Sequence, residues 1–318
     1  MLSRQYSGAM SQQSDTNEAL INQEFGPVTV LFGARGGKYP HGNSMRVRGE
    51  KESVVIDPSL GLVARGSPPP PADRVLFSHC HEDHIAGAHL YPDIPWHFHK
   101  ADLPGIQSLD NFMGIYGFSP EVDAGFRPAI EKQFHFMARP DALSYEDDDV
   151  FDLGGVRIRV LHTPGHTRGH CCFLIDWDGS DDRILYLGDI DLSSFGPYYG
   201  DAWSNLEDFE RSLLRVRKVE ARWYATFHHI GVLETQAKFL EKLDRFAAVI
   251  GKREARLLDF IGEPRSMEEI VEHRFVYRPG DAVGFAEPVE RRSMGMHLER
   301  LMAAGRVTCS GDQRYLSC

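Results

Sequence analysis

The first half of the chain alternates between short apolar, β-branched runs and polar turns rich in Gly, Pro and Asn. The runs cover residues 27–34, 43–49, 53–59, 75–77 and 94–99. Runs of this length between turn residues are typical of strands, so we expect one sheet here. Residues 100–149 differ and predict a helical insertion, in which Ser119 caps a helix that begins at Pro120.

The second half repeats the alternation and adds a helix. Its apolar runs cover residues 156–162, 171–176, 183–189 and 221–227. Between the last two, Ser204 and Glu207 have the spacing of a capping box that opens a helix. Strands in both halves with helices between them predict an α/β fold over residues 26–233, in which two sheets carry helices outside both, an αββα sandwich.

From about residue 234 the apolar period becomes that of helices. Apolar residues recur at helical spacing in residues 239–250 and 294–302, and Ser266 with Glu269 forms a second capping box. Residues 306–318 give two short strands around Ser-Gly-Asp. We therefore expect a small, mostly helical domain over residues 234–318 that ends in a hairpin.

Composition places the chain among ordinary globular proteins. Its 318 residues are 42% hydrophobic and 25% charged, and no apolar run approaches the ~20 residues that span a bilayer. Residues 1–25 are polar and lack the apolar core of a secretory signal, so we expect a flexible N-terminus. Five cysteines, an odd number, argue against a disulfide framework. We expect a cytoplasmic protein without a membrane partner.

One polar cluster carries the chemistry: residues 79–84 read His-Cys-His-Glu-Asp-His. His79 and His81 are two residues apart, so both side chains leave the same face of an extended segment. Asp83 and His84 turn towards that face if a helix begins there. Such nitrogen and oxygen ligands suit zinc first, with iron or manganese as alternatives. Cys80 points to the other face, where we expect it to pack.

Three further motifs follow: His162-Thr-Pro-Gly-His166-Thr, Leu187-Gly188-Asp189 and His228-His229-Ile-Gly. With the hexamer, this series resembles the metallo-β-lactamase superfamily, and its pattern without a cysteine ligand resembles the glyoxalase II, lactonase and nuclease branches. The tail resembles the winged-helix tail of some hydrolases with this fold. The resemblance implies two divalent metal ions, with this ligand set: His79, His81 and His166 for one, Asp83, His84 and the last histidine for the other, and Asp189 bridging both.

The last ligand is one of two adjacent histidines. Residues 222–227 read as a strand, and both His228 and His229 follow it. We choose His228 because it comes first after the strand, which leaves His229 as a supporting or substrate-facing group. Asp57 follows an earlier strand, in a position that supports the metal loop in this family; a simple turn residue is the alternative.

Two metal ions about 3.5–4 Å apart lower the pKa of water from ~15.7 to near 7, so a metal-bridging hydroxide would attack a carbonyl or phosphoryl centre. The candidates for proton transfer to the leaving group are Asp83, His228 and His229. The candidates for substrate contact are His170, Tyr198 and Tyr199, for which a structural hydrogen bond or plain packing is the alternative.

We expect the substrate to be an ester, thioester or lactone of a small molecule. Two alternatives stay open: a phosphodiesterase or ribonuclease acting on nucleic acid, and a mononuclear-iron thiol or sulfur dioxygenase. Proteins that bind nucleic acid concentrate Lys and Arg, whereas this chain has a net charge of −11 and a pI near 5.7. We therefore expect no nucleic-acid partner, and we expect the apolar helices of the tail to contribute to a homodimer.

Overall fold

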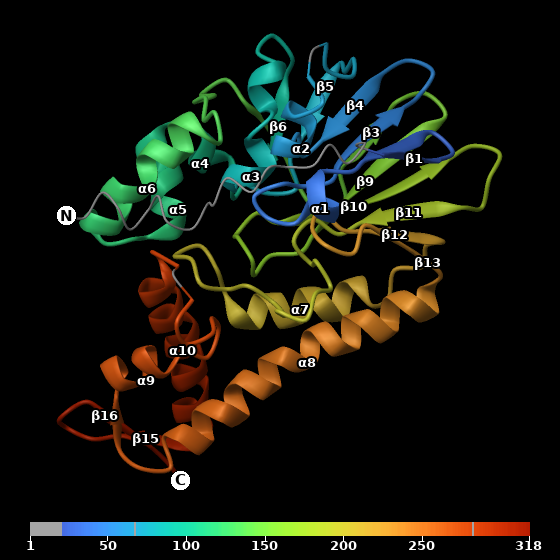
Figure 1. Cartoon of the computed structure of the whole chain (residues 1–318). Coiled ribbons are helices and arrows are strands. Elements are labelled where there is room, and N and C mark those ends of the chain that lie inside the picture. The colour runs from blue at the N-terminus through green and yellow to red at the C-terminus, as the bar shows by residue number, and fades with distance from the viewer. Residues whose placement is uncertain (1–20, 67, 282) are drawn as a thin grey trace.

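Two β-sheets packed face to face form the centre of the molecule in Figure 1, a computed structural model that describes residues 21–66, 68–281 and 283–318. The first sheet contains, in spatial order, β1 (Asn22–Phe25), β2 (Val28–Leu31), β3 (Ser44–Arg48), β4 (Ser53–Ile56), β5 (Arg74–Leu76), β6 (Trp96–His99) and β7 (Leu143–Tyr145). The second contains β13 (Val232–Glu234), β12 (Trp223–Ala225), β11 (Arg183–Tyr186), β10 (Cys171–Trp177), β9 (Val156–His162) and β8 (Val150–Asp152).

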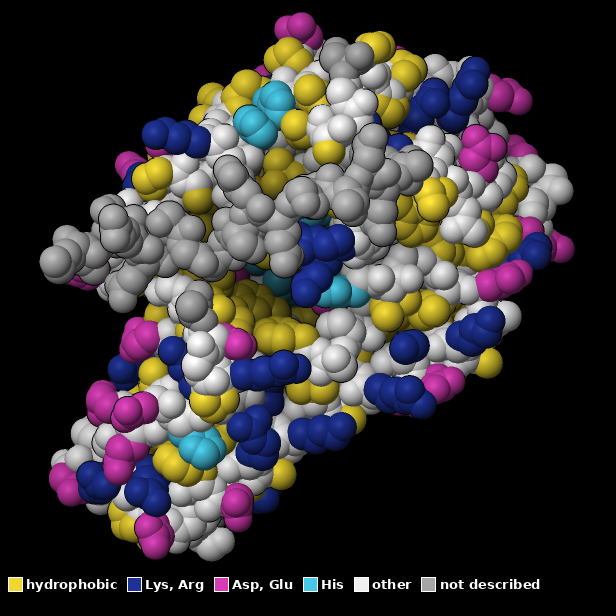
Figure 2. Space-filling view, in the orientation of Figure 1, with side chains coloured by type: hydrophobic (Ala, Val, Ile, Leu, Met, Phe, Trp, Pro, Cys, Tyr) yellow, Lys and Arg dark blue, Asp and Glu magenta, His cyan; other side chains and the backbone are white. Residues whose placement is uncertain are grey.

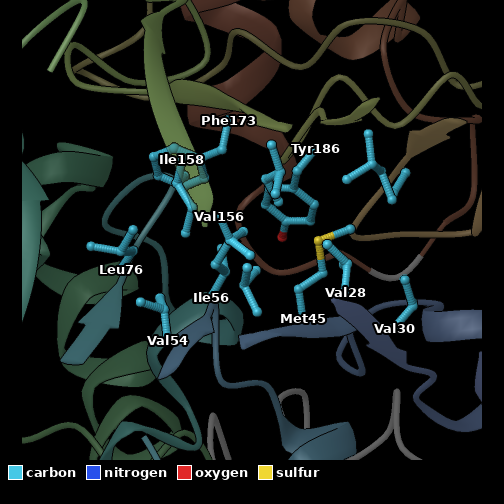
Figure 3. Close-up of a cluster of buried hydrophobic side chains, with 14 of the residues drawn as sticks. Val28, Val30, Met45, Val54, Ile56, Leu76, Val156, Ile158, Phe173 and Tyr186 are labelled. Carbon is cyan, nitrogen blue, oxygen red and sulfur yellow. The ribbon is translucent and has the colours of Figure 1, made fainter. Parts of the chain in front are cut away.

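The main core lies between the two sheets (Figure 3). Alternate residues of a strand point to opposite faces, so Val28 and Val30 of β2 meet Ile158 of β9 in this core. Arg157 and Arg159, their neighbours on β9, point outward and pair with aspartates. The apolar runs that predicted these strands therefore supply the side chains of the core.

Helices cover the outer face of each sheet. The first sheet carries α2 (Leu60–Val63), α3 (Glu82–Ile85), the short helix η2 (Ala88–Leu90), α4 (Leu103–Ile106), α5 (Leu109–Tyr116) and α6 (Pro120–Lys132). The second carries α7 (Leu206–Val216) and the first half of α8 (Gln236–Phe260). This order of layers confirms the predicted αββα fold.

The tail forms a separate small core below the sheets in Figure 1. It contains the second half of α8, β14 (Arg265–Ser266), α9 (Met267–His273), α10 (Ala286–Ala303), β15 (Val307–Cys309) and β16 (Arg314–Ser317). Ser266 caps α9 through the predicted capping box, and β15 pairs with β16 in the predicted hairpin. Among the described residues, no helix is both long enough and apolar enough to cross a membrane.

Two predictions about local structure are wrong. Asn205, not Ser204, caps α7, because the Ser204 hydroxyl instead donates to the carbonyl oxygen of His166 at 2.7 Å. Residues 22–25, expected in a flexible N-terminus, form β1, because they pair with β2 along its whole length. The rest of that predicted segment, residues 1–20, lies outside the described residues.

The separate core of the tail makes a testable contribution to stability. Leu257 of α8 is fully buried there, whereas Leu214 of α7 is 61% exposed. We expect Leu257→Ala to lower the free energy of unfolding by about 2–5 kcal/mol, since it leaves a cavity. The matched change Leu214→Ala should alter it by less than about 0.5 kcal/mol. Urea denaturation followed by circular dichroism measures both, and equal effects would contradict the burial of Leu257.

Candidate metal centre

The hexamer lies where strand β5 gives way to helix α3 at one edge of the sandwich. The chain bends at Ser78 and His79 and is extended at His81, and α3 begins at Glu82, so Asp83 and His84 turn back towards His79 and His81. All four side chains are buried. Cys80 points to the opposite side and packs in the core beneath the helices, as predicted.

The first group consists of three imidazoles whose nitrogens face a common point. His79 Nε2 lies 3.1 Å from His81 Nδ1, and His166 Nε2 lies 3.0 Å from that His81 atom and 3.2 Å from that His79 atom. His166 stands in the loop between β9 and β10, more than eighty residues away along the chain. The fold thus brings the second motif to the hexamer.

The second group consists of Asp83, His84 and His228, which lie close enough together to share one ion. His228 Nε2 is 2.9 Å from Asp83 Oδ2, and His84 Nε2 is 4.0 Å from Asp83 Oδ1. His228 lies three residues after the end of β12, in a turn closed by Thr226, whose hydroxyl donates to the carbonyl oxygen of His228. His229 has a left-handed backbone with a φ of 58°, and its side chain is exposed outside both groups.

Asp189 stands between the two groups and presents one carboxylate oxygen to each. Its Oδ2 is 3.3 Å from His166 Nε2, while its Oδ1 is 2.9 Å from His84 Nε2 and 3.8 Å from His228 Nε2. The preceding Gly188 has a φ of 52°, and a Cβ there would lie 2.7 Å from His170 Nε2. The residue before Asp189 must therefore be glycine, for reasons of both backbone angle and space.

In three of these imidazoles Nε2 faces the ligand group, and Nδ1, the outer nitrogen, faces away from it. The hydrogen bond made by the outer nitrogen determines which nitrogen carries the lone pair. Nδ1 of His166 faces the carbonyl oxygen of Tyr198, Nδ1 of His228 faces that of Gly37, and Nδ1 of His84 faces the carboxylate of Asp57. Only a protonated nitrogen can donate to these acceptors, so in the neutral rings the inner Nε2 atoms carry lone pairs. Those lone pairs converge on one another and on Asp83 and Asp189.

Converging lone pairs and carboxylates fit divalent cations. A proton could join a single pair such as His228 and Asp83, but it cannot satisfy three nitrogens that face one point. Histidine and carboxylate ligands with no thiolate suit zinc, iron or manganese. Hydrogen bonds from the outer nitrogens to carbonyl or carboxylate oxygens are the usual support of such ligands.

The charges around the centre are consistent with this fit. Burial lowers the pKa of His84, but the carboxylates of Asp189, Asp57 and Asp83 outweigh it and raise this pKa well above its ordinary value. Burial also lowers the pKa of His228, but Asp189 and Asp83 raise it to about 9. The carboxylates therefore favour positive charge in the second group.

Asp57 is the buried carboxylate that fixes the hexamer. Its Oδ1 accepts from the backbone N–H of Ser78 at 2.7 Å, and its Oδ2 accepts from Tyr186 Oη at 2.7 Å and from His84 Nδ1 at 2.9 Å. Its φ of 46° is unusual for a residue other than glycine, and the surrounding bonds hold it there. The position gives Asp57 the supporting role that the family pattern suggested.

A second buried carboxylate, Asp102, was not singled out from the sequence. It accepts from the backbone N–H of Cys80 at 3.1 Å, from Thr167 Oγ1 at 2.6 Å and from the backbone N–H of Gly169 at 2.7 Å. It therefore ties the hexamer to the loop that carries His166. Like Asp57, it follows a strand at this edge of the sheet, and that was the only signal available.

Glu82, inside the hexamer, was also missed. It is buried, and it accepts hydrogen bonds from Tyr39 Oη at 2.9 Å and from Tyr116 Oη at 2.5 Å. Burial and the neighbouring charge of Asp83 raise the pKa of Glu82. The two tyrosines thus connect the centre to the loop after β2 and to the helical insertion.

The three residues predicted to contact the substrate lie at different positions relative to the centre. His170 is fully buried beneath the centre, where its Nε2 accepts from the backbone N–H of Asp189, so it holds a ligand and does not face a substrate. Tyr199 is buried and its hydroxyl pairs with His297 of α10, which also removes it from the centre. Tyr198 alone lies at the rim, with its hydroxyl 3.0 Å from Asp201, the ion-pair partner of His81.

Comparisons with known proteins agree with this geometry. A family model described as the metallo-beta-lactamase superfamily matches residues 39–250. The chain is 28% identical over 228 residues to the acyl-coenzyme A thioesterase MBLAC2 of Homo sapiens, a match that covers 63% of this chain and 79% of that protein. It is 28% identical over 198 residues to an atrochrysone carboxyl ACP thioesterase of Passalora fulva, covering 57% of this chain and 46% of that protein.

Among solved structures, a metallo-beta-lactamase family protein from Thermus thermophilus has a TM-score of 0.67 at 22% identity. That match covers 92% of this chain and 99% of the other, so the shared fold extends into the tail. The family model spans more than half of the chain and includes the hexamer and the three later motifs. The chain belongs to the metallo-beta-lactamase superfamily.

Proposed function

We propose that this protein is a metal-dependent hydrolase of thioesters, with two divalent metal ions, zinc first, held by the two groups around Asp189. The observation that carries the proposal is Asp189 itself, whose two oxygens face different groups of buried ligands. Two of the named relatives are thioesterases, which supports a thioester among the ester, thioester and lactone substrates expected from the sequence.

In this proposal His79, His81 and His166 hold one ion, Asp83, His84 and His228 hold the other, and Asp189 bridges them. When bound, the two ions would supply a bridging hydroxide as nucleophile near neutral pH and polarise the substrate carbonyl. The chain's own part is to fix this geometry. Asp57 and Asp102 anchor the two ligand loops, and the buried surroundings exclude competing water.

The leaving group of a thioester needs little protonation by a side chain of the protein. A thiol has an ordinary pKa near ~8.5, so it departs as a thiolate with little need for a proton. Asp83 and His228 face each other within the second group, which leaves the exposed His229 as the imidazole free to exchange a proton at the rim. We therefore assign His229 at most a secondary part in thioester hydrolysis.

A small-molecule substrate is also supported by the charges of the tail. Three of its arginines pair with carboxylates: Arg291 with Glu287, Arg300 with Glu254, and Arg314 with Glu269. Paired arginines do not form the continuous basic surface that binds nucleic acid. Assignment to the glyoxalase II or lactonase branch, the winged-helix class of the tail, the homodimer and the cytoplasmic location stay predictions.

Metal content is the first test. We expect close to two equivalents of zinc, iron or manganese per chain in protein purified without added metal, because two groups of buried ligands share Asp189. Elemental analysis measures this, and chelation should abolish hydrolysis. One tightly bound iron, with oxygen uptake on thiol substrates, would favour the dioxygenase instead.

Asp189→Ala and His229→Ala distinguish a bridging ligand from a neighbouring side chain. Asp189→Ala should cost both ions and more than about a hundredfold in kcat/KM, above the loss usual for groups that merely support a ligand. His229→Ala should keep both ions and lose less than the ~100-fold that removal of a general acid costs. Metal content and kcat/KM, measured for both variants, distinguish the bridging ligand from the neighbouring side chain. Loss of an ion from His229→Ala, with two retained in His228→Ala, would reverse our choice within the doublet.

A substrate panel tests the reaction class. We expect kcat/KM to be highest on thioesters, lower on oxygen esters and lactones, and negligible on phosphodiesters and oligoribonucleotides, because a net charge of −11 disfavours polyanionic substrates. The Asp189→Ala variant is the matched control, since contaminating hydrolases would persist in its preparation. Metal-dependent cleavage of the phosphodiesters alone would refute the thioester proposal.

A further inference from the structure

A continuous strip of aromatic rings begins at the candidate metal centre and runs outward. The ring of Tyr116 lies nearly parallel to that of His81 with centroids 5.5 Å apart, and Phe118 stacks on Tyr116 at 5.1 Å. Phe285 of the tail stacks on Phe118 at 5.8 Å. We name Tyr116, Phe118, Phe285, Tyr277 and Phe195 the aromatic strip; its last two contacts are Phe285 to Tyr277 at 6.4 Å and Tyr277 to Phe195 at 5.8 Å.

The aromatic strip combines three segments that are far apart in the sequence. Tyr116 and Phe118 come from the insertion, Phe195 from the loop after Asp189, and Tyr277 and Phe285 from the stretch between α9 and α10. Phe118, Tyr277 and Phe285 are half-buried, and Phe195 is 38% exposed, so the strip has a free face. Figure 2 shows a hollow with an apolar floor where the α9–α10 region meets the catalytic layers.

The tail holds its part of the aromatic strip in place with buried polar contacts. The carboxylate of Glu290 is fully buried and accepts from the backbone N–H groups of Phe275, Val276 and Tyr277. Arg292 of α10 donates to the carbonyl oxygens of Tyr116 and Gly200. These bonds fasten both the tail and the insertion to the loop after Asp189, so the strip is held in a fixed position.

Tyr277 also lies within the electrostatic reach of the centre. Burial raises the pKa of its hydroxyl, and the negative charge of Asp201, the ion-pair partner of His81, raises it further. The aromatic strip touches the first ligand group at one end, where the ring of Tyr116 stacks on that of His81. A thioester has an acyl arm and a thiol arm on the two sides of its carbonyl group. When the carbonyl lies at the centre, one of these arms lies along the aromatic strip and the other points away from it.

The two rims of the centre differ in charge. On the side of the second group, Arg35 and Lys38 are exposed, and no ion pair joins either of them to an acidic side chain among the described residues. Arg35 lies in the short helix α1 (Ala34–Gly37) and Lys38 follows it, next to the Gly37 carbonyl that accepts from His228 Nδ1. These cationic side chains would suit a thioester whose thiol arm is polar and anionic, while the aromatic strip suits an apolar arm.

We propose that the aromatic strip is the acyl-binding wall of the active site, and that the tail, through Tyr277 and Phe285, selects thioesters with a hydrocarbon or aryl acyl group. The proposal rests on the thioester hydrolysis proposed above and adds the acyl class to it. Each methylene laid against the wall should raise kcat/KM by about fourfold, the ratio that corresponds to ~0.8 kcal/mol per buried methylene.

The test compares acetyl to decanoyl thioesters of one thiol on wild type, Phe285→Ala, Phe285→Trp and Phe260→Ala. Phe260 is the matched control, because it is a half-buried phenylalanine of the same tail that stacks on His273, outside the strip. The decanoyl-to-acetyl ratio of kcat/KM should fall about fifteenfold or more in Phe285→Ala, a loss equivalent to two buried methylenes, and stay unchanged in Phe260→Ala. Phe285→Trp should move the optimum to shorter chains. An unchanged ratio in both Phe285 variants would overturn the proposal.

Binding separates this proposal from that of thioester hydrolysis. Calorimetry with decanoate and butyrate needs no turnover, and wild type should bind decanoate more tightly, with that preference lost in Phe285→Ala and kept in Phe260→Ala. If the preference is present but no thioester is cleaved, the reaction class is wrong and the wall stands. If thioesters are cleaved without any preference for chain length, the wall is wrong and the reaction class stands.

Discussion

The convergence of buried imidazole nitrogens and carboxylates on two neighbouring points is the constraint on which the rest of the structure depends. His79, His81 and His166 bring three buried nitrogens within about 3 Å of one another, and a single proton cannot satisfy all three. Burying polar groups without full partners costs free energy. Cations bound among them would offset this cost, and the surroundings hold each ring at a fixed angle. The outer layer of carbonyls and carboxylates provides that fixing.

Two buried aspartates show how the fold provides it. Asp57 and Asp102 both follow strands at the same edge of the first sheet, and each receives three or more donors from the ligand loops and the strands beside them. Asp57 organises the hexamer, and Asp102 joins the hexamer to the loop of His166. The rigid sheet thus determines the geometry of loops that would otherwise be free to move, as is common for sites built at strand ends.

Much of this could be predicted from the sequence, because the informative signals are local. The apolar run of residues 156–162 predicted β9 with its observed bounds, and the spacing of His79, His81, Asp83 and His84 predicted a shared face. The choice of His228 over His229 followed from its place after the strand, and a left-handed turn at His229 does separate the two side chains. Such signals need no knowledge of distant contacts.

What could not be predicted depends on tertiary contacts. Ser204 has the right spacing for a cap, but its hydroxyl is taken by the carbonyl of His166, so Asn205 replaces it. Tyr198 and Tyr199 are neighbours, and only the packing of His297 against Tyr199 decides which of them reaches the rim. The aromatic strip combines the insertion with the tail, and no local pattern links Phe118 to Phe285.

The central claim is that Asp189 bridges two metal ions. Anomalous diffraction from crystals of the protein as purified, recorded on both sides of the metal absorption edge, tests it most directly. The account predicts two peaks ~3.5–4 Å apart, one among His79, His81 and His166 and one among Asp83, His84 and His228, with an oxygen of Asp189 bound to each. A single peak, or a second ion that Asp189 does not touch, would contradict it.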